Sequence, residues 1–295
     1  MTIKKGIYAA SMSVFKDDLS LDVDFTIRHA EKVIQDGCHG AVIFGSTGQA
    51  QLISSIEKKL LIEKLSLSKF KDNFIIGTGN NSLNENIELM KHCINNGFKK
   101  FLIMPPAYYV YSDDGAYSFF ENLIKEIKTC EIILYNFEKL CGYKFSSEIV
   151  KKLVKNFPEQ IVGVKDSTYN LYEKIKIPNF LIFPGSEIKL LKSLQLGCSG
   201  IISAVCNVTA PLARKVYDDY SDKNKKQNFN ERLCSVRKVF DGYNLISGLH
   251  SFMSVEEPKY KNVLPPLNIL NDTDQKELLK KLKELDFSPI KKIAA

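Results

Sequence analysis

The sequence lacks long hydrophobic runs. No stretch of about 18 apolar residues, the length needed to cross a membrane as a helix, occurs among its 295 residues. Near the N-terminus, Lys4 and Lys5 precede a short apolar run, Ile7–Ala10, but Ser11 and Ser13 interrupt it before it reaches the length of a signal-peptide core. We therefore expect a cytoplasmic protein with no membrane partner.

Metal-binding and disulfide patterns are also missing. The seven cysteines are an odd number and form no C-x-x-C pair, and the four histidines form no H-E-x-x-H motif. This spacing argues against a disulfide framework and against a zinc site, and it favours reduced thiols. We expect no metal and no metal cofactor.

Arginine is scarce. Lysine and arginine together number 41 against 34 acidic residues, a net charge of +7, but only four of the 41 are arginines. The lysines stand in scattered pairs with acidic residues among them, and no stripe of alternating basic and aromatic residues occurs. Such a pattern is typical of a solvated surface. We therefore expect no nucleic-acid partner.

The sequence does contain enough apolar residues for a globular core, with 44% hydrophobic and 25% charged residues. Eight short runs are rich in β-branched residues and are continuous rather than alternating. Continuous runs are typical of strands buried on both faces, as in a parallel sheet covered by helices. The predicted strands cover residues 7–14, 40–44, 74–78, 101–104, 132–135, 161–164, 180–183 and 200–203.

The segments between these runs have helical periodicity. Ser54 with Glu57, and Ser82 with Glu85, are spaced as capping boxes, and Gly37, Gly97 and Gly197 are placed to end helices. Eight strands, each followed by a helix, predict an α/β fold of the (β/α)8 TIM barrel type with a small C-terminal helical extension. A doubly wound open sheet commonly has fewer strands.

The strand pattern stops after about residue 223. A linker rich in lysine and asparagine covers residues 222–230, and helices are predicted around 231–247 and 273–285, with Pro258, Pro265 and Pro266 between them. We predict a catalytic barrel over residues 1–223 and a C-terminal helical region over 224–295, which packs on the barrel or on a neighbouring subunit.

Two residues at predicted strand ends are candidates for catalysis, because reactive groups in such barrels lie at the C-terminal ends of the strands. Lys165 directly follows four apolar strand residues, where partial burial would leave some uncharged amine to attack a carbonyl. Tyr135 ends the fifth strand, where its hydroxyl can transfer a proton. The alternatives are a solvated lysine and an aromatic side chain that fills the barrel mouth.

A polar turn follows the second strand and contains Ser46 and Thr47 between two glycines. Its hydroxyls and accessible backbone N–H groups can hold a small carboxylate. The alternative is an ordinary turn stabilised by its own hydroxyls.

These features, together with Met104–Tyr109 after the fourth strand and Pro184–Glu187 after the seventh, resemble the dihydrodipicolinate synthase and N-acetylneuraminate lyase family of class I pyruvate-dependent aldolases. The resemblance covers about residues 5–223. It implies a lyase that acts on a small 2-oxo acid and an aldehyde through a covalent Schiff base, without a metal, and that assembles as a homotetramer built from dimers.

The resemblance also implies roles for individual residues. Lys165 would form the Schiff base with pyruvate or another 2-oxo acid, and Tyr135 would be the acid and base. Ser46 and Thr47 would hold the carboxylate, and the carbonyl of Ile202 would face the bound keto acid.

A further implied role falls on the aromatic pair after the fourth strand. Tyr108 would reach across a dimer contact to complete a proton relay with Thr47 and Tyr135, and Tyr109 remains an alternative for that role. Both tyrosines could instead only pack a subunit interface.

The choice of substrate depends on Leu140. In the synthase branch, the residue five positions after the tyrosine is usually an arginine that binds the carboxylate of the aldehyde, and here it is leucine. We therefore predict cleavage or formation of a 2-oxo-3-deoxy acid, with Ser167, Ser186 and Glu187 bonded to substrate hydroxyls, although Glu187 could instead cap the following helix. The alternatives are dihydrodipicolinate synthase, which condenses pyruvate with aspartate semialdehyde, and a non-catalytic 2-oxo-acid sensor.

Overall fold

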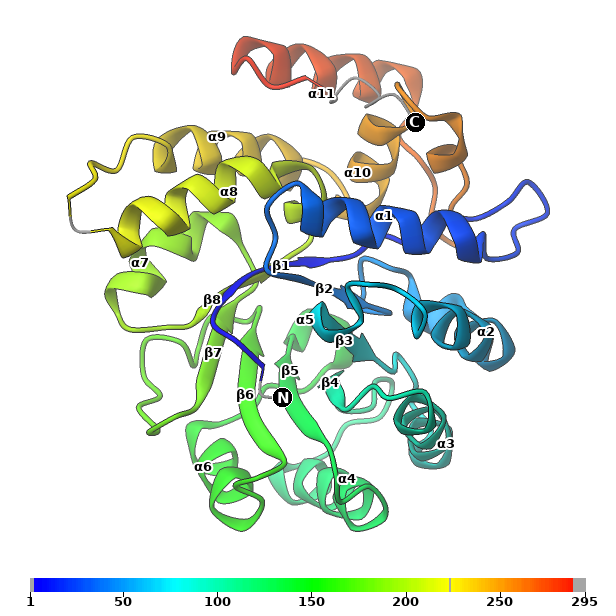
Figure 1. The fold of residues 1–295 in the computed structure, drawn as a ribbon, viewed down its shortest axis with the longest axis vertical. Coiled ribbons are helices and arrows are strands. Elements are labelled where there is room, and N and C mark those ends of the chain that lie inside the picture. Colours follow the sequence, from blue (N-terminus) through cyan, green and yellow to red (C-terminus); the bar gives the residue numbers. More distant parts are fainter. Residues whose placement is uncertain (1–2, 223, 289–295) are drawn as a thin grey trace.

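Eight parallel strands form a nearly closed barrel in the computed structural model, which describes residues 3–222 and 224–288 (Figure 1). The strand order is β7-β6-β5-β4-β3-β2-β1-β8, and the backbone N–H of Ser199 donates to Ile182 O (2.8 Å) where the two ends of the sheet meet. This confirms the predicted (β/α)8 TIM barrel. The strands are β1 (Gly6–Ala10), β2 (Gly40–Ile43), β3 (Phe74–Gly77), β4 (Lys100–Ile103), β5 (Glu131–Asn136), β6 (Ile161–Asp166), β7 (Leu181–Pro184) and β8 (Gly200–Ser203).

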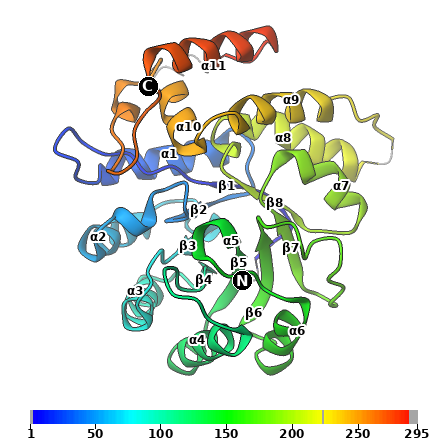
Figure 2. The ribbon, with the colours of Figure 1, turned by 180° about the vertical axis from the view of Figure 1, so that it is seen from behind.

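Helices surround the strands on the outside of the barrel (Figures 1 and 2). The helix beginning after Ser54 has the predicted capping box, and Gly97 follows its helix at a φ of +85°, which residues other than glycine rarely adopt. The helices of the barrel are α1 (Val23–Gln35), α2 (Ser55–Leu65), α3 (Leu83–Asn95), α4 (Asp113–Glu126), α5 (Glu138–Cys141), α6 (Ser147–Asn156), α7 (Leu190–Gln195) and α8 (Cys206–Ser221).

The first strand is shorter than predicted and ends at Ala10 instead of Val14. Beyond it, the N–H of Ser11 still donates to Val42 O (2.9 Å), but the N–H groups of Met12 and Val14 bond to side chains. Asn207 Oδ1 accepts from the N–H of Met12 (3.1 Å), and Thr26 Oγ1 accepts from the N–H of Val14 (3.0 Å). Met12 and Val14 are therefore apolar because they are buried, and not because they pair in the sheet.

The sixth βα unit departs from the predicted alternation. The strand β6 extends to Asp166, so that Lys165 lies within it, and the described segment 167–180 contains turns but no regular helix before β7. The carboxylate of Asp166 accepts from the N–H groups of Tyr169, Leu171 and Tyr172 (2.8 to 2.9 Å). A side chain thus satisfies the backbone groups that a helix would otherwise pair.

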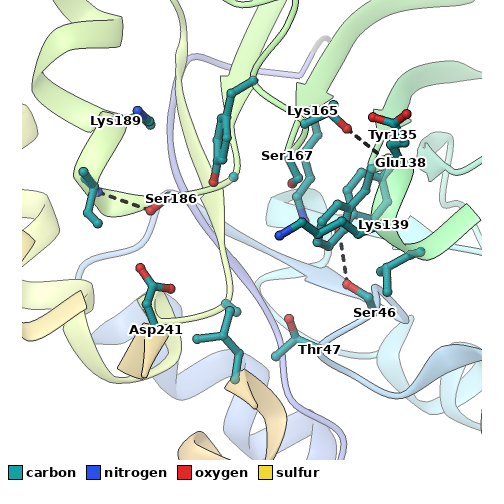
Figure 3. Close-up of a pocket in the computed structure, with 18 of the residues that line it drawn as sticks. Ser46, Thr47, Tyr135, Glu138, Lys139, Lys165, Ser167, Ser186, Lys189 and Asp241 are labelled. Carbon is teal, nitrogen blue, oxygen red and sulfur yellow. Dashed lines mark hydrogen bonds between the residues drawn. The ribbon is translucent and has the colours of Figure 1, made fainter. Parts of the chain in front are cut away.

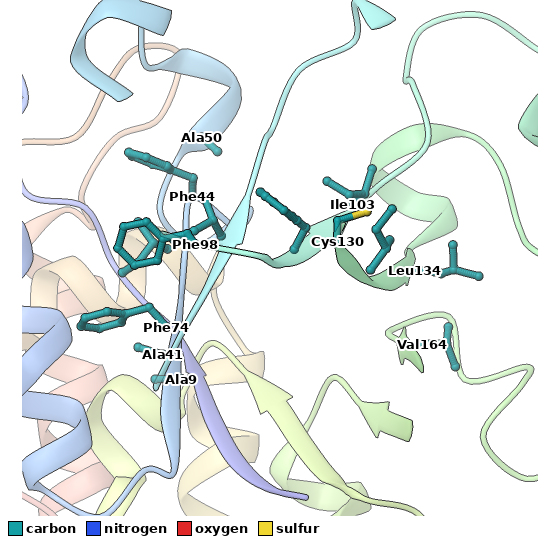
Figure 4. Packing of buried hydrophobic residues seen from close by; sticks show 14 of the residues in the cluster. Ala9, Ala41, Phe44, Ala50, Phe74, Phe98, Ile103, Cys130, Leu134 and Val164 are labelled. Atoms are coloured by element: carbon teal, nitrogen blue, oxygen red, sulfur yellow. The ribbon is translucent and has the colours of Figure 1, made fainter. Parts of the chain in front are cut away.

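Side chains on alternate strand positions form two separate apolar layers. Those pointing outward pack beneath the helices, and Leu134 and Val164 belong to this layer (Figure 4). Those pointing inward fill the barrel, and Ile133, Tyr135 and Ile202 belong to this second cluster. Because successive strand residues face opposite sides, the inward direction of Tyr135 follows from the outward direction of Leu134.

Three helices follow the barrel: α9 (Asn230–Asp241), α10 (Leu245–Met253) and α11 (Asp272–Glu284). The single helix predicted over 231–247 is wrong, because α9 ends at Asp241 and Asn244 then caps α10 by accepting from the N–H groups of Ile246 and Ser247. The boundary that we placed at residue 223 falls on a residue outside the described part of the chain, as do residues 289–295.

The helix α9 lies beside α8, and α11 lies on the outer side of α9 and α10 (Figures 1 and 2). The three C-terminal helices share an apolar cluster with the segment after β1 and with the start of α8. Its barrel members are Met12, Val14, Val205 and Val208, and its C-terminal members include Val236, Phe240, Leu249, Phe252, Tyr260, Leu278 and Leu282. None of the described helices is long and apolar enough to span a membrane.

Candidate active site

Lys165 and Tyr135 lie side by side inside the barrel. The strands β5 and β6 pair in a register that sets Tyr135 opposite Lys165. The Lys165 side chain is buried, with 3% of the residue exposed, and its Nζ lies 4.1 Å from the centroid of the Tyr135 ring. This distance is within the range of a cation–π contact. The register of two neighbouring strands therefore brings the amine and the phenol together (Figure 3).

Ser46 and Thr47 approach from the loop after β2. Ser46 Oγ lies 3.1 Å from the Tyr135 hydroxyl, at hydrogen-bond distance, and Thr47 is buried beside it. The loop is a tight turn, since the N–H of Gly48 donates to Gly45 O (3.1 Å). The predicted pair of hydroxyls thus lies next to the phenol, and both side chains face the same space (Figure 3).

A cavity of about 790 Å³ opens at this end of the barrel. Six of the predicted site residues line it: Ser46, Thr47, Tyr135, Lys165, Ser167 and Ser186. Across the cavity from Ser46 and Thr47 lie Ser186, Lys189 and Asp241 (Figure 3). The volume lies within the range of pockets that enclose small molecules.

Three predicted site residues are not among those that line this cavity. Glu187 is fully buried behind it, and its Oε2 accepts from Ser203 Oγ (2.7 Å) and from Arg237 Nη1 (2.8 Å). Ile202 is fully buried in the inner cluster. Tyr108 lies on the loop between β4 and α4, with 88% of the residue exposed, and its ring packs against that of Tyr109 (5.1 Å between centroids).

Side chains from the C-terminal helical region form part of the cavity wall, and sequence analysis missed them. Arg237 and Asp241 of α9, with Asn244 before α10, line the cavity. Arg237 Nε donates to Asp241 Oδ1 (2.8 Å), and Nη1 donates to Glu187 Oε2 and to Ser203 Oγ (3.0 Å). Burial disfavours the charged guanidinium, but the carboxylates of Glu187 and Asp241 outweigh this and raise the pKa of Arg237 above its ordinary value.

The spacing of Arg237 and Asp241 at positions i and i+4 is a signal that was present in the sequence. It places the two side chains on one face of a helix. It does not say which face of the barrel that helix covers, so the wall of the cavity could not be assigned from it.

A second, more apolar cavity of about 400 Å³ adjoins the first. The two share Ser46, Tyr135, Leu140 and Ile246, and Leu102 is among the other residues of the second cavity. Leu140, the residue at the expected position of an arginine, therefore lies at the boundary between the two cavities.

The described residues 3–222 and 224–288 contain no group of three or more His, Cys, Asp or Glu side chains placed to hold a metal ion. The groups that line the cavity are hydroxyls, three amines, a guanidinium, an amide and two carboxylates. Such an arrangement can bind a small polar molecule and exchange protons with it.

Comparison with known sequences identifies relatives over nearly the whole chain. The dihydrodipicolinate synthetase family matches residues 4–285. A 4-hydroxy-tetrahydrodipicolinate synthase of Methanothrix thermoacetophila is 27% identical over 292 residues, covering 95% of this chain and 98% of the relative. An N-acetylneuraminate lyase of Fusobacterium nucleatum is 30% identical over 224 residues, covering 72% and 75%.

Solved structures share the fold. YagE of E. coli K12, a protein of the dihydrodipicolinic acid synthase family solved in complex with pyruvate, superimposes with a TM-score of 0.87 at 22% identity, over 97% of this chain and 100% of that one. The residues that we identified from the sequence thus lie in a barrel of known architecture. The chain belongs to the dihydrodipicolinate synthetase family, a family of lyases and aldolases.

Proposed function

We propose that this enzyme is a class I pyruvate-dependent aldolase that cleaves or forms a 2-oxo-3-deoxy acid through an iminium on Lys165. The observation that carries the proposal is the position of Lys165 Nζ, buried in the barrel mouth and 4.1 Å from the ring of Tyr135, whose hydroxyl meets Ser46 Oγ. A nucleophile, an acid or base and a carboxylate-binding turn then face one cavity.

The first step forms the covalent intermediate. Lys165 Nζ attacks the keto carbon of the substrate, Tyr135 gives its phenol proton to the hydroxyl that departs, and loss of this hydroxyl as water leaves the iminium and the Tyr135 phenolate. Ser46 and Thr47 bind the adjacent carboxylate through hydroxyl and backbone N–H groups, which orients the keto carbon toward the amine. Only 3% of Lys165 is exposed, so an iminium formed there would be shielded from bulk water, which would otherwise hydrolyse it early.

The second step breaks the bond between carbons 3 and 4. Tyr135 accepts the proton of the hydroxyl on carbon 4, that oxygen becomes the aldehyde carbonyl, and the bonding electrons move to the iminium to form an enamine. The enamine is then protonated at carbon 3, and water releases pyruvate and the free amine. A positioned acid or base of this kind commonly contributes about 10²- to 10⁴-fold in rate. The iminium itself is the electron sink, so the proposed reaction needs no metal cofactor.

The cavity wall supports an aldehyde that carries hydroxyl groups. Ser167, Ser186 and Asn244 offer donors and acceptors, and Asp241 offers carboxylate oxygens. Glu187, which we expected to bind hydroxyls, already binds Arg237 and Ser203. We therefore assign recognition of the hydroxyls to Ser167 and Ser186 together with side chains of the C-terminal region.

A second copy of the chain would complete the site, in the homotetramer that the family resemblance implies. The loop after β4 exposes three consecutive large apolar residues, Tyr108, Tyr109 and Val110, at 88%, 75% and 99%. Exposed apolar groups of this kind mark protein contacts. We place Tyr108 of one subunit in a proton relay with Thr47 and Tyr135 of its partner, and we place the enzyme in the cytoplasm.

Reductive trapping tests the proposal directly. Wild-type protein and Lys165→Ala are incubated with pyruvate and borohydride, and intact masses are measured. The expected result is a covalent pyruvate adduct on the wild-type chain and none on the variant. An unmodified wild-type chain would overturn the aldolase mechanism and favour a sensor that binds 2-oxo acids without catalysis.

Dihydrodipicolinate synthase is the second candidate. The similarity to the Methanothrix thermoacetophila synthase favours it, and Lys139 lines the cavity where it can meet a carboxylate. A flexible ammonium does not replace the planar donor pair of an arginine. Steady-state assays that compare aspartate semialdehyde plus pyruvate with 2-oxo-3-deoxy sugar acids separate the two, and efficient turnover of the semialdehyde alone would refute our choice.

A further inference from the structure

We propose that Asn136 and Asp166 are positioning residues that hold Tyr135 and Lys165 in the geometry needed for imine formation. This inference rests on the proposed function, because it concerns the same two side chains. Asn136 directly follows Tyr135 and Asp166 directly follows Lys165, and the strand register pairs Asn136 with Asp166 just as it pairs the two reactive residues.

Asn136 is fully buried, and all parts of its side-chain amide are used. Its Nδ2 donates to Asp166 Oδ1 (2.8 Å) and to Asn170 Oδ1 (2.7 Å). Its Oδ1 accepts from the backbone N–H of Phe145 (3.1 Å). A single amide thus joins β5 to β6 and to the segment before α6.

Asp166 is also fully buried, and it receives four hydrogen bonds. Oδ1 accepts from Asn136 and from the N–H of Tyr169 (2.8 Å), and Oδ2 accepts from the N–H groups of Leu171 (2.8 Å) and Tyr172 (2.9 Å). Hydrogen bonds to a carboxylate are roughly twice as strong as those between neutral groups. This carboxylate therefore fixes the chain beyond Lys165, where the regular helix is missing.

The positions of Asn136 and Asp166 on their strands explain how they would control the distance between Tyr135 and Lys165. Tyr135 and Lys165 stand near the ends of their strands, and the last backbone contact between these strands is from the N–H of Ser167 to Asn136 O (2.9 Å). Side chains alternate across a strand, so Asn136 and Asp166 bond on the outer side of the barrel while their neighbours face the cavity. The hydrogen bond between Asn136 and Asp166 thus sets the separation of the Tyr135 and Lys165 side chains.

Loss of the hydrogen bond between Asn136 and Asp166 is expected to slow catalysis strongly. A misplacement of about 1 Å in reacting groups costs on the order of 10²-fold in rate. Without the amide of Asn136, the backbone bond from Ser167 N–H to Asn136 O remains, but the side-chain hydrogen bond to Asp166 is lost. The Tyr135 ring and the Lys165 amine are then held less firmly at their separation. Pyruvate binding at Ser46 and Thr47 depends on a different loop and would be retained.

Asn136→Ala tests the inference, with the rate of borohydride-trapped pyruvate adduct as the main readout. We expect adduct formation per folded molecule and kcat to fall together, each on the order of 10²-fold, while the KM for pyruvate changes little. Asp166→Asn keeps the side-chain volume, places an amide against the Asn136 amide and is expected to give the same pattern. It serves as the second variant if Asn136→Ala does not fold.

Asn73→Ala is the matched control, because Asn73 Nδ2 anchors a loop at the opposite end of the barrel by donating to His39 O (2.8 Å). Thermal unfolding and circular dichroism establish the folded fraction of each protein. A folded Asn136→Ala that traps pyruvate at the wild-type rate, or a loss no larger than that in Asn73→Ala, overturns the positioning role. Failure of the wild-type protein to form any adduct would instead defeat the proposed function.

Discussion

Lowering the pH from 7 to 5 should weaken the folded state, because two buried histidines are held neutral in it. Burial lowers the pKa of His29 to about 4 and that of His250 to about 4, from 6.5 for the exposed side chain. Between pH 6.5 and 4, His29 and His250 therefore bind protons in the unfolded chain but stay neutral in the folded chain. The stability due to the neutral histidines is complete above pH 6.5 and is lost as the pH falls toward 4.

The hydrogen bonds explain why protonation is resisted. His250 Nδ1 bonds to Tyr260 O (2.8 Å), and its Nε2 faces the amide Nε2 of Gln49 (3.3 Å), so a second ring proton would meet a donor. His29 Nε2 faces Asn207 Oδ1 (2.7 Å), and its Nδ1 faces the hydroxyl of Tyr260 (2.6 Å). Each neutral ring fits its partners with one donor and one acceptor.

The magnitude follows from the two pKa values. A difference of about 2.5 units between unfolded and folded states corresponds to a loss of about 2 kcal/mol per histidine at pH 5, and about 4 kcal/mol for both. That is a large fraction of the ~5–15 kcal/mol by which a native protein is commonly stable. Urea unfolding at pH 7, 6 and 5, followed by tyrosine fluorescence or circular dichroism at one protein concentration, measures it.

Substitution separates the histidines from other groups. His29→Gln should reduce the loss between pH 7 and pH 5 by about 2 kcal/mol, because one of the buried titrating rings is gone. His92→Gln, which replaces a partly exposed ring, is the matched control for the exchange of a histidine for a glutamine. A free energy of unfolding that stays flat from pH 7 to pH 5, or a pH dependence that His29→Gln leaves intact, would refute the reasoning.

Three further predictions concern the cavity. Tyr135→Phe should lower kcat by about 10²- to 10⁴-fold while borohydride still traps pyruvate on the chain, as measured by turnover and intact mass; unchanged turnover would remove Tyr135 from the mechanism. Arg237→Leu should lower the free energy of unfolding, measured in urea, by about 3–5 kcal/mol, because Glu187 is left as a buried, unpaired charge. Adding Glu187→Gln to that variant should recover part of the lost free energy. Leu140→Arg should raise kcat/KM for aspartate semialdehyde relative to a sugar acid, and an unchanged ratio would show that residue 140 does not select the aldehyde.

The barrel and the proximity of Tyr135 to Lys165 could be predicted because strong, local signals specify them. Continuous apolar runs such as 132–135 and 161–164 mark strands that are buried on both faces. A lysine and a tyrosine at the ends of two such runs meet once the strands are neighbours in parallel register. Neither step requires knowledge of distant contacts.

The rest depended on contacts between distant segments. The helix predicted after β6 is absent because the Asp166 carboxylate pairs with the backbone of that segment, a geometry that residue type alone does not reveal. Likewise, Arg237 reaches the cavity only because the C-terminal helices pack on the segment after β1 and on α8. The contact between Glu187 and Arg237 could not be predicted for the same reason, since the two residues lie 50 positions apart.

The contribution of α9 to the cavity has a consequence for biosynthesis. Translation delivers all eight strands before it delivers Arg237, so a nascent barrel that has already closed still carries Glu187 without its counterion and leaves Val205 and Val208 open to water. A barrel without the C-terminal helices would thus have Ser46, Thr47, Tyr135 and Lys165 but lack the part of the cavity wall that Arg237 and Asp241 form. Chaperones are expected to bind such a chain until the C-terminal helices are synthesised and cover its exposed apolar residues.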